Sequence, residues 1–254
     1  MSNSVVMLRC HDIKPNTLEC IRLMFQQSPH DVYVVFDATD KEPFHDTYPV
    51  WNFSVEDYRS SGYPAPTPEQ LRDLPTPPRN PCILPIYYNP EIANIMFGKR
   101  FPDYQYYWYI EYDVFFNGQW QDFFELFRNS DEDFLGAYLR QYPFKWWNAK
   151  IETHLPLDIP QDCIFRFFGC IARFSAQLLA VLDSEYSAGH IGYYELAVPS
   201  LCANNGLKLG DLNADERNVY TPLTLGGESL KFAWSRLGQK WIDQHNNMLF
   251  HPIR

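Results

Sequence analysis

The chain has 254 residues, with 21 Lys and Arg against 31 Asp and Glu, and its formal net charge is −10. This acidity excludes broad binding to nucleic-acid backbones, which needs clustered basic side chains. The acidic charge is still compatible with a nucleotide ligand, because a metal ion and a few hydrogen-bond donors can hold one diphosphate. An apolar share of 46% argues against disorder, and the length is sufficient for a sizeable core.

Features that mark export or membrane insertion are missing from the sequence. No apolar run approaches 18 residues, and residues 1–6 lack the charged and apolar regions of a signal peptide. The six cysteines form no CxxC pair, so free buried thiols are expected instead of disulfides or a zinc site. We expect a soluble cytoplasmic protein. Peripheral association with a membrane surface is an alternative that stays open.

The first forty residues predict a strand, a helix and a second strand. Val5–Leu8 is a short apolar run, and Asn16 with Glu19 has the spacing of a capping box that begins a helix. The apolar run 32–36 follows. This order is typical of a βαβ unit with a parallel sheet.

Ligands of parallel sheets bind beyond the carboxyl ends of the strands. The polar residues after the two predicted strands are therefore expected near any site. They are Arg9, His11, Asp12, Asp37 and Thr39.

Residues 63–90 hold nine of the 20 prolines and are expected to be mostly loop. Within them, Thr67–Gln70 predicts the start of a short helix, and Cys82–Leu84 a short strand. Residues 106–114 are the strongest strand signal, aromatic on both faces as a central buried strand is. A helix with an apolar face of Trp120, Phe123, Phe124 and Phe127 is expected next.

The second half continues the alternation of helices and strands. Residues 134–142 are expected to be a short helix or loop, 165–171 a strand, and the segment carrying Leu178, Leu179 and Leu182 a helix. Pro199 is expected to open a helix that Gly206 closes, before a last strand at 207–212. The tail is expected to be mostly loop and one helix. With no linker in sight, the pattern predicts a single α/β domain over residues 1–254.

Glu111 and Asp113 end the central strand. Two carboxylates two residues apart on an extended chain point to one side and can share Mg²⁺ or Mn²⁺, which prefer oxygen ligands. The alternative is that the strand stops at Ile110 and both acids are solvated.

Two further residues are candidates for chemistry. Glu195 is flanked by tyrosines and apolar residues, so burial is expected to raise its pKa for general-base work; the alternative is a helix-start carboxylate. His251 lies in an apolar segment near the end, as a metal ligand or as a packed surface histidine.

Tryptophans form the last group. Trp146 and Trp147 are adjacent in an expected loop, and tryptophan faces suit the C–H faces of sugars. The alternative for them is core packing. No GxSxG, GxxxxGK[ST] or GxGxxG motif is present where such chemistry needs it.

The order of these features resembles that of GT-A-fold glycosyltransferases. Residues 107–114 look like their DxD strand, with Glu111 in place of the first Asp, and residues 192–196 like their xED segment, with Leu196 in place of its Asp. His251 is similar to their C-terminal metal-binding histidine. The resemblance runs from about Val5 to His251. It implies a GT-A-like, Rossmann-like domain with a central mixed, mostly parallel sheet flanked by helices.

The resemblance also implies roles, which are stated here as expectations. A nucleotide-binding part would cover about residues 1–115 and an acceptor-binding part about 116–254. Asp113 and His251 would ligate Mn²⁺ or Mg²⁺, Glu111 would contact the donor ribose or the metal through water, and Glu195 would be the base. Base and ribose would be held by Arg9, His11, Asp37 and Thr39, and the acceptor by Trp146 and Trp147.

The expected function is transfer of a sugar from a nucleotide-sugar donor, UDP-linked by expectation, to a saccharide or glycoconjugate acceptor. Two alternatives stay open at this point. One is a non-catalytic carbohydrate-binding or scaffold protein on the same fold. The other is a metal-dependent nucleotidyltransferase, which also uses paired acids on an α/β sheet.

Overall fold

The computed structural model describes residues 3–72, 84–144, 151–156, 159–214, 219 and 246–251. The helices within them are α1 Pro15–Gln27, α2 Val55–Ser60, α3 Pro68–Arg72, α4 Leu84–Tyr88, α5 Glu91–Arg100, α6 Trp120–Glu125, α7 Ile151–His154, α8 Ala176–Ser187 and α9 Tyr194–Asn204, with a 3₁₀ turn at Gln161–Cys163. The strands are β1 Ser4–Cys10, β2 Asp31–Asp37, β3 Val50–Phe53, β4 Tyr106–Glu111, β5 Phe115–Phe116, β6 Phe134–Gln141, β7 Phe165–Ser175, β8 Leu209–Asp211 and β9 Leu249–Phe250. None of these helices is long and apolar enough to cross a membrane.

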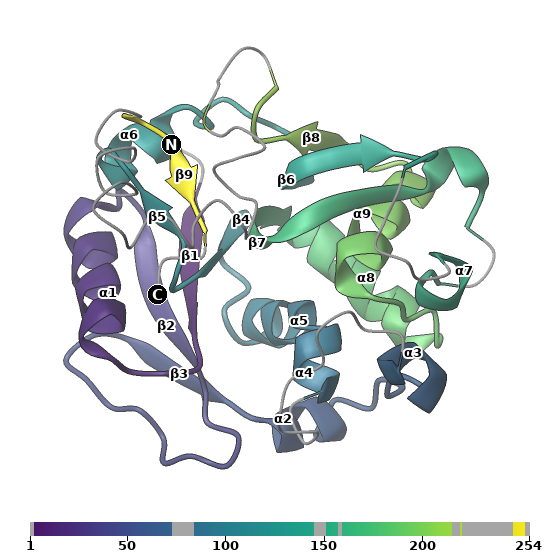
Figure 1. The fold of residues 1–254 in the computed structure, drawn as a ribbon, viewed down its shortest axis with the longest axis horizontal. Coiled ribbons are helices and arrows are strands. Elements are labelled where there is room, and N and C mark those ends of the chain that lie inside the picture. Colours follow the sequence, from purple (N-terminus) through teal and green to yellow (C-terminus); the bar gives the residue numbers. More distant parts are fainter. Residues whose placement is uncertain are drawn as a thin grey trace.

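A seven-stranded sheet forms the centre, in the order β3-β2-β1-β4-β7-β6-β8 (Figure 1). The pairs β3·β2, β2·β1, β1·β4 and β6·β8 are parallel, while β4·β7 and β7·β6 are antiparallel. The predicted α/β class, with a mixed and mostly parallel sheet flanked by helices, is confirmed. The predicted βαβ unit at the start is confirmed by the parallel register of β1 with β2.

The strand order changes direction at β1. The chain runs outward from β1 to β2 and β3, and then β4 pairs with the other side of β1. In open α/β sheets such a switch point leaves a crevice at the carboxyl ends of the strands, because the connections leave on opposite sides. The β1·β4 register sets Arg9 directly opposite Glu111 at this place.

The core has two parts, one on each face of the sheet. On one face, alternate β1 residues such as Val6 and Leu8 pack with Ile21 of α1 and Phe123 of α6. On the other face, Met7 belongs to a cluster with residues of α5, α8 and α9. Apolar side chains on both faces of β1 and β4 are what two-sided burial of parallel strands requires.

Several local predictions are confirmed. Thr67 begins α3 as expected, with its hydroxyl accepting from the Gln70 backbone and the Gln70 side chain accepting from Thr67 N. The expected apolar faces of α6 and α8 are buried. The described cysteines are free thiols, three of them buried: Cys10, Cys170 and Cys202.

Two expected helix starts are wrong. α1 begins at Pro15, without a side-chain cap, because proline at the first position needs no partner for a backbone N–H. α9 begins at Tyr194 and contains Pro199, which was expected to open it. Packing of α9 along β7 outweighs the lost backbone hydrogen bond at the proline.

Two segments have a different structure from the one expected. Residues 134–141 form the strand β6. The register of β6 with β7 shifts twice, and Tyr138 has a φ of 53°. Because of these irregularities, the apolar residues of β6 do not alternate as they do in a regular strand. Leu84 begins a helix and not a strand, while Cys82 lies outside the described residues. The error at β6 concerns a segment whose pairing partners, β7 and β8, follow it at a distance in the sequence.

Candidate functional site

A cleft of about 740 Å³ opens at the carboxyl ends of β1, β2 and β4. This volume is within the range of small-molecule sites. The cleft is lined by eight residues that the sequence singled out, namely Arg9, His11, Asp37, Thr39, Glu111, Asp113, Glu195 and His251. Trp146 and Trp147 lie outside the described residues.

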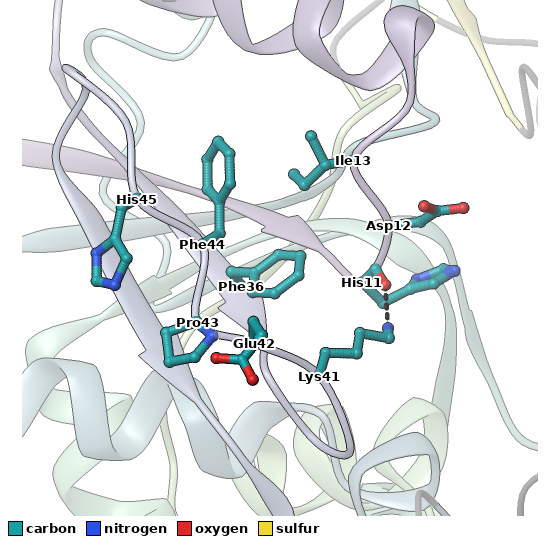
Figure 2. Close-up of a pocket in the computed structure, with 9 residues that line it drawn as sticks. All are labelled: His11, Asp12, Ile13, Phe36, Lys41, Glu42, Pro43, Phe44 and His45. Carbon is teal, nitrogen blue, oxygen red and sulfur yellow. Dashed lines mark hydrogen bonds between the residues drawn. The ribbon is translucent and has the colours of Figure 1, made fainter.

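A second, more open hollow of about 730 Å³ adjoins the cleft and shares His11 and Lys41 with it. Phe36 and Phe44 form its apolar side, and Asp12 lies at its rim (Figure 2). The Lys41 ammonium donates to the backbone carbonyl of His11. This contact ties the loop after β2 to the end of β1 where the two hollows meet.

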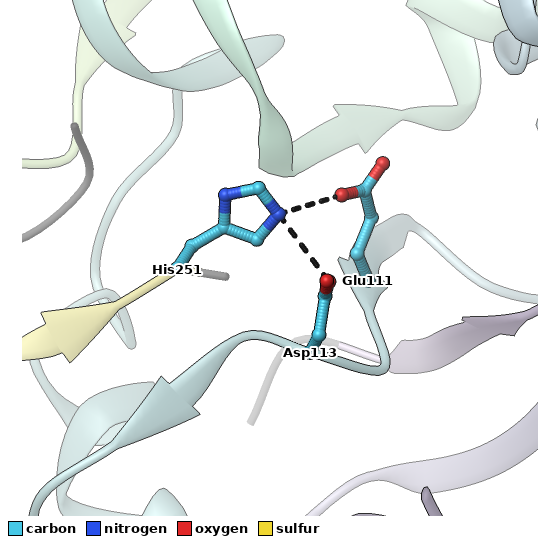
Figure 3. Close-up of side chains that lie close together, drawn as sticks. All are labelled: Glu111, Asp113 and His251. Carbon is cyan, nitrogen blue, oxygen red and sulfur yellow. Dashed lines mark hydrogen bonds and ion pairs between the residues drawn. The ribbon is translucent and has the colours of Figure 1, made fainter. Parts of the chain in front are cut away.

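Two acids and a histidine meet inside the cleft (Figure 3). Glu111 is the last residue of β4, and Asp113 lies in the turn that follows. His251 comes directly after β9, and pairing of β9 with β5 brings it back beside that turn. Its Nε2 lies 3.0 Å from Glu111 Oε2 and 3.3 Å from Asp113 Oδ1.

The surroundings of this triad differ from those of solvated acids. Asp113 is only 5% exposed, so the alternative of a solvated strand end is wrong for it. Burial alone lowers the pKa of His251, but hydrogen bonds to Asp113 and Glu111 and their charge outweigh it and raise that pKa to about 9. The His251 side chain is 14% exposed and packs edge-on against Phe168, and its role as a metal ligand stays a prediction.

The triad has the donor atoms that a divalent cation needs. One ligand atom from each residue lies within 4.8 Å of the other two, close to the spacing of ligands around one ion. Carboxylate oxygens suit Mg²⁺ and Mn²⁺, and an imidazole nitrogen favours Mn²⁺ of the two. The imidazole must give up its Nε2 proton to bind a metal, so metal and proton compete for one position.

Tyr109 holds Glu111, and Arg9 lies beside Tyr109. The buried Tyr109 hydroxyl donates to Glu111 Oε1 at 3.0 Å, and burial holds the pKa of this tyrosine well above 10. The Arg9 guanidinium lies 5.7 Å from the Tyr109 ring and donates to the carbonyl of Pro90 at 2.8 Å. These contacts fix one oxygen of Glu111 and leave the other directed at His251.

Asp37 and Thr39 shape the loop after β2. Asp37 accepts from the Thr39 backbone N–H at 2.9 Å, and the Thr39 hydroxyl accepts from Val55 N at 2.9 Å where α2 begins. Both side chains are buried, although both line the cleft. Their contacts hold the loop at the mouth of the cleft.

Glu195 also lines the cleft. It lies in the first turn of α9, which agrees with the alternative of a carboxylate at the start of a helix. Gly169 of β7 donates its backbone N–H to Glu195 Oε1 at 3.0 Å. A Cβ on Gly169 would lie 1.6 Å from the Tyr194 hydroxyl, so only glycine permits this close approach.

Sequence reasoning missed the contributions of β7 and of residues 86–90. Phe168 lies edge-on to His251, with ring centroids 5.6 Å apart, and Ile86, Tyr87 and Pro90 form another part of the wall. One signal was present in the sequence. A glycine inside an apolar strand, here Gly169, indicates a bulge or a close approach.

Comparisons with known proteins give little beyond the fold. The chain matches no protein-family model and no curated protein. Among solved structures it is similar to one assigned as a Bacillus anthracis glucose-1-phosphate thymidylyltransferase, in complex with a sucrose (10% identity, 83% of this chain, 86% of that chain, TM-score 0.42). It is also similar to mouse xyloside xylosyltransferase 1 in its apo form (10% identity, 98% of this chain, 97% of that chain, TM-score 0.46). Likeness this distant carries no argument about activity.

Proposed function

We propose that this protein is a metal-assisted glycosyltransferase. It would move a sugar from a nucleotide-sugar donor to a saccharide or glycoconjugate acceptor, and a UDP-linked sugar is the first donor to test. The observation that carries the proposal is one cleft that holds the triad of Glu111, Asp113 and His251 together with a third carboxylate, Glu195.

The donor would lie across the ends of β1, β2 and β4. Asp113 and His251 would hold Mn²⁺ or Mg²⁺, with Glu111 contacting the ion through water or the donor ribose. When bound, the ion supplies charge neutralisation for the departing diphosphate. The polar groups at the strand ends would contact base and ribose: Arg9, His11, Asp37 and Thr39.

The acceptor would approach Glu195. If the reaction inverts the anomeric centre, this carboxylate takes the proton from the acceptor hydroxyl while that oxygen attacks the anomeric carbon. The Gly169 N–H bond to Oε1 keeps the carboxylate aimed while the acceptor binds. Trp146 and Trp147 remain our prediction for an acceptor platform.

Calorimetry with nucleoside diphosphates, with and without Mn²⁺, is the first test. We expect Mn²⁺-dependent binding of one nucleotide that Asp113→Asn weakens. No binding at millimolar nucleotide would contradict the proposal.

Product analysis with a panel of nucleotide sugars is the second test. Release of nucleoside diphosphate, lost in Glu195→Gln and kept in the exposed control Glu56→Gln, supports glycosyl transfer. Release of pyrophosphate from a nucleoside triphosphate and a sugar phosphate would show nucleotidyl transfer instead. Binding without turnover of any donor would show a non-catalytic binding protein.

A further inference from the structure

Two arginines oppose each other on neighbouring strands. Arg140 of β6 and Arg166 of β7 are direct partners in the antiparallel register. Side chains of directly opposed residues share one face and lie close together, so two like charges there repel and destabilise the pair. Two paired arginines are unusual in a chain whose net charge is −10.

The contacts of the two guanidinium groups differ. Arg140 is exposed, donates to its neighbour's backbone carbonyl at 2.8 Å and lies 3.4 Å from Asp211 Oδ2. Arg166 is half-buried, with its guanidinium 5.3 Å from the Phe144 ring centroid. Its Nε is buried without a hydrogen-bond partner, and none of the described carboxylates lies within ion-pair distance of it.

Electrostatics agree with this contact pattern. Burial lowers the pKa of Arg166, the charge of Glu195 raises it, and the charge of Arg140 lowers it further. Arg166 is therefore a cation that has lost part of its hydration, lies opposite a second cation, and has no carboxylate in contact among the residues that the structure describes. A partly buried cation of this kind destabilises the fold unless an anion pairs with it.

The pair lies next to the part of β7 that lines the cleft, since Phe168 and Gly169 belong to that lining. Ile110, near the end of β4, pairs with Ile171, so the β7 residues before Ile171 extend past the end of β4. Phe168, which touches His251, is two residues from Arg166 on the same strand, and the charge of Glu195 acts on Arg166. A molecule that starts at Glu195 and extends along β7 toward Phe165 would therefore meet the two arginines.

We propose that Arg140 and Arg166 form a subsite for an oxyanion carried by the acceptor, a carboxylate or a phosphate. The planar guanidinium fork matches both groups and binds each of them through paired hydrogen bonds. This inference rests on the proposed function and adds to it that the acceptor is an acidic saccharide or a phosphorylated sugar chain.

Calorimetry on the full chain tests the subsite with matched probes. A trisaccharide of uronic acids is compared with its methyl ester, and a hexose 6-phosphate with the hexose, so each anion has a neutral counterpart of nearly equal shape. We expect at least one anionic probe to bind about tenfold or more tightly than its neutral partner, because charge-assisted hydrogen bonds are among the stronger ones. Equal affinity within both pairs would overturn the proposal.

Variants assign the effect to these residues. Arg166→Gln is expected to remove the preference for the anion and leave binding of the neutral probe unchanged, while Arg166→Lys keeps part of it. The control Arg22→Gln removes an exposed arginine of α1 and should behave as the wild type. An anion preference that survives in Arg166→Gln would refute the assignment.

A nucleotide titration of the same samples separates the two proposals. Nucleotide binding without any preference for anionic saccharides contradicts the subsite alone. A preference for anions that depends on Arg166, without nucleotide binding, contradicts the proposed function alone.

Discussion

Glu91 is a buried acid whose ionisation we expect to limit stability at neutral pH. It is 1% exposed at the start of α5, and its Oε1 accepts from Asn89 Nδ2 at 3.0 Å and from the Tyr186 hydroxyl. Its Oε2 is buried without a hydrogen-bond partner among the described residues. Burial raises the pKa of Glu91 from 4.5 to about 7, although these hydrogen bonds oppose the change.

The pKa difference sets the size and sign of the effect. The folded state holds the proton more tightly than the unfolded state, so the stabilisation is complete below pH 4.5 and is lost as the pH rises through about 7. At about 1.4 kcal/mol per pH unit, the free energy of unfolding falls by about 3 kcal/mol over this window. Glu91→Gln keeps the acceptor oxygen and cannot ionise, so it should lack this fall.

Urea denaturation at pH 5, 6, 7 and 8 measures the difference. Between pH 5 and pH 8 the free energy of unfolding of the wild type should fall by about 2–3 kcal/mol more than that of Glu91→Gln. Glu56→Gln, an exposed matched control, should follow the wild type throughout. Identical pH dependence of Glu91→Gln and the wild type would refute the reasoning.

Three further predictions concern the cleft. Asp113→Asn should weaken Mn²⁺ binding by about tenfold or more in calorimetry, because one charged ligand is lost; unchanged affinity would remove Asp113 from the metal site. Tyr109→Phe deletes the 3.0 Å hydrogen bond to Glu111, and should lower Mn²⁺ affinity by about tenfold and the free energy of unfolding by about 1 kcal/mol; a change in stability alone would show a structural role only. Gly169→Ala should cost about 1–3 kcal/mol in urea denaturation, since its Cβ would collide with the Tyr194 hydroxyl. Adding Tyr194→Phe to Gly169→Ala removes the nearest atom and should restore part of the loss; equal stability of Gly169→Ala and the wild type would contradict the collision.

The sequence was informative wherever one segment carries its own signal. The apolar runs of β1, β2 and β4, the capping of α3 by Thr67, and the apolar faces of α6 and α8 are local patterns with the period of a strand or a helix. Because parallel strands end at one edge of a sheet, the same patterns also predicted that Arg9, His11, Asp37 and Thr39 lie near one site, and all four line the cleft.

Segments that depend on distant partners were misread or missed. β6 is a strand because β7 and β8 pair with it, and its irregular register removes the alternation that marks a strand. α9 keeps Pro199 in its interior because it packs along β7.

What the sequence by itself determined is the type of most elements and the chemistry at the ends of the parallel strands. Only the tertiary structure decided how the site closes. The β5·β9 pairing carries His251 back over a long separation in the chain to Asp113, and the close approach of Tyr194 to Gly169 aims Glu195 into the same cleft. The physical reason is that hydrophobic period and capping act over a few residues, whereas strand pairing and close packing join residues that no local pattern connects.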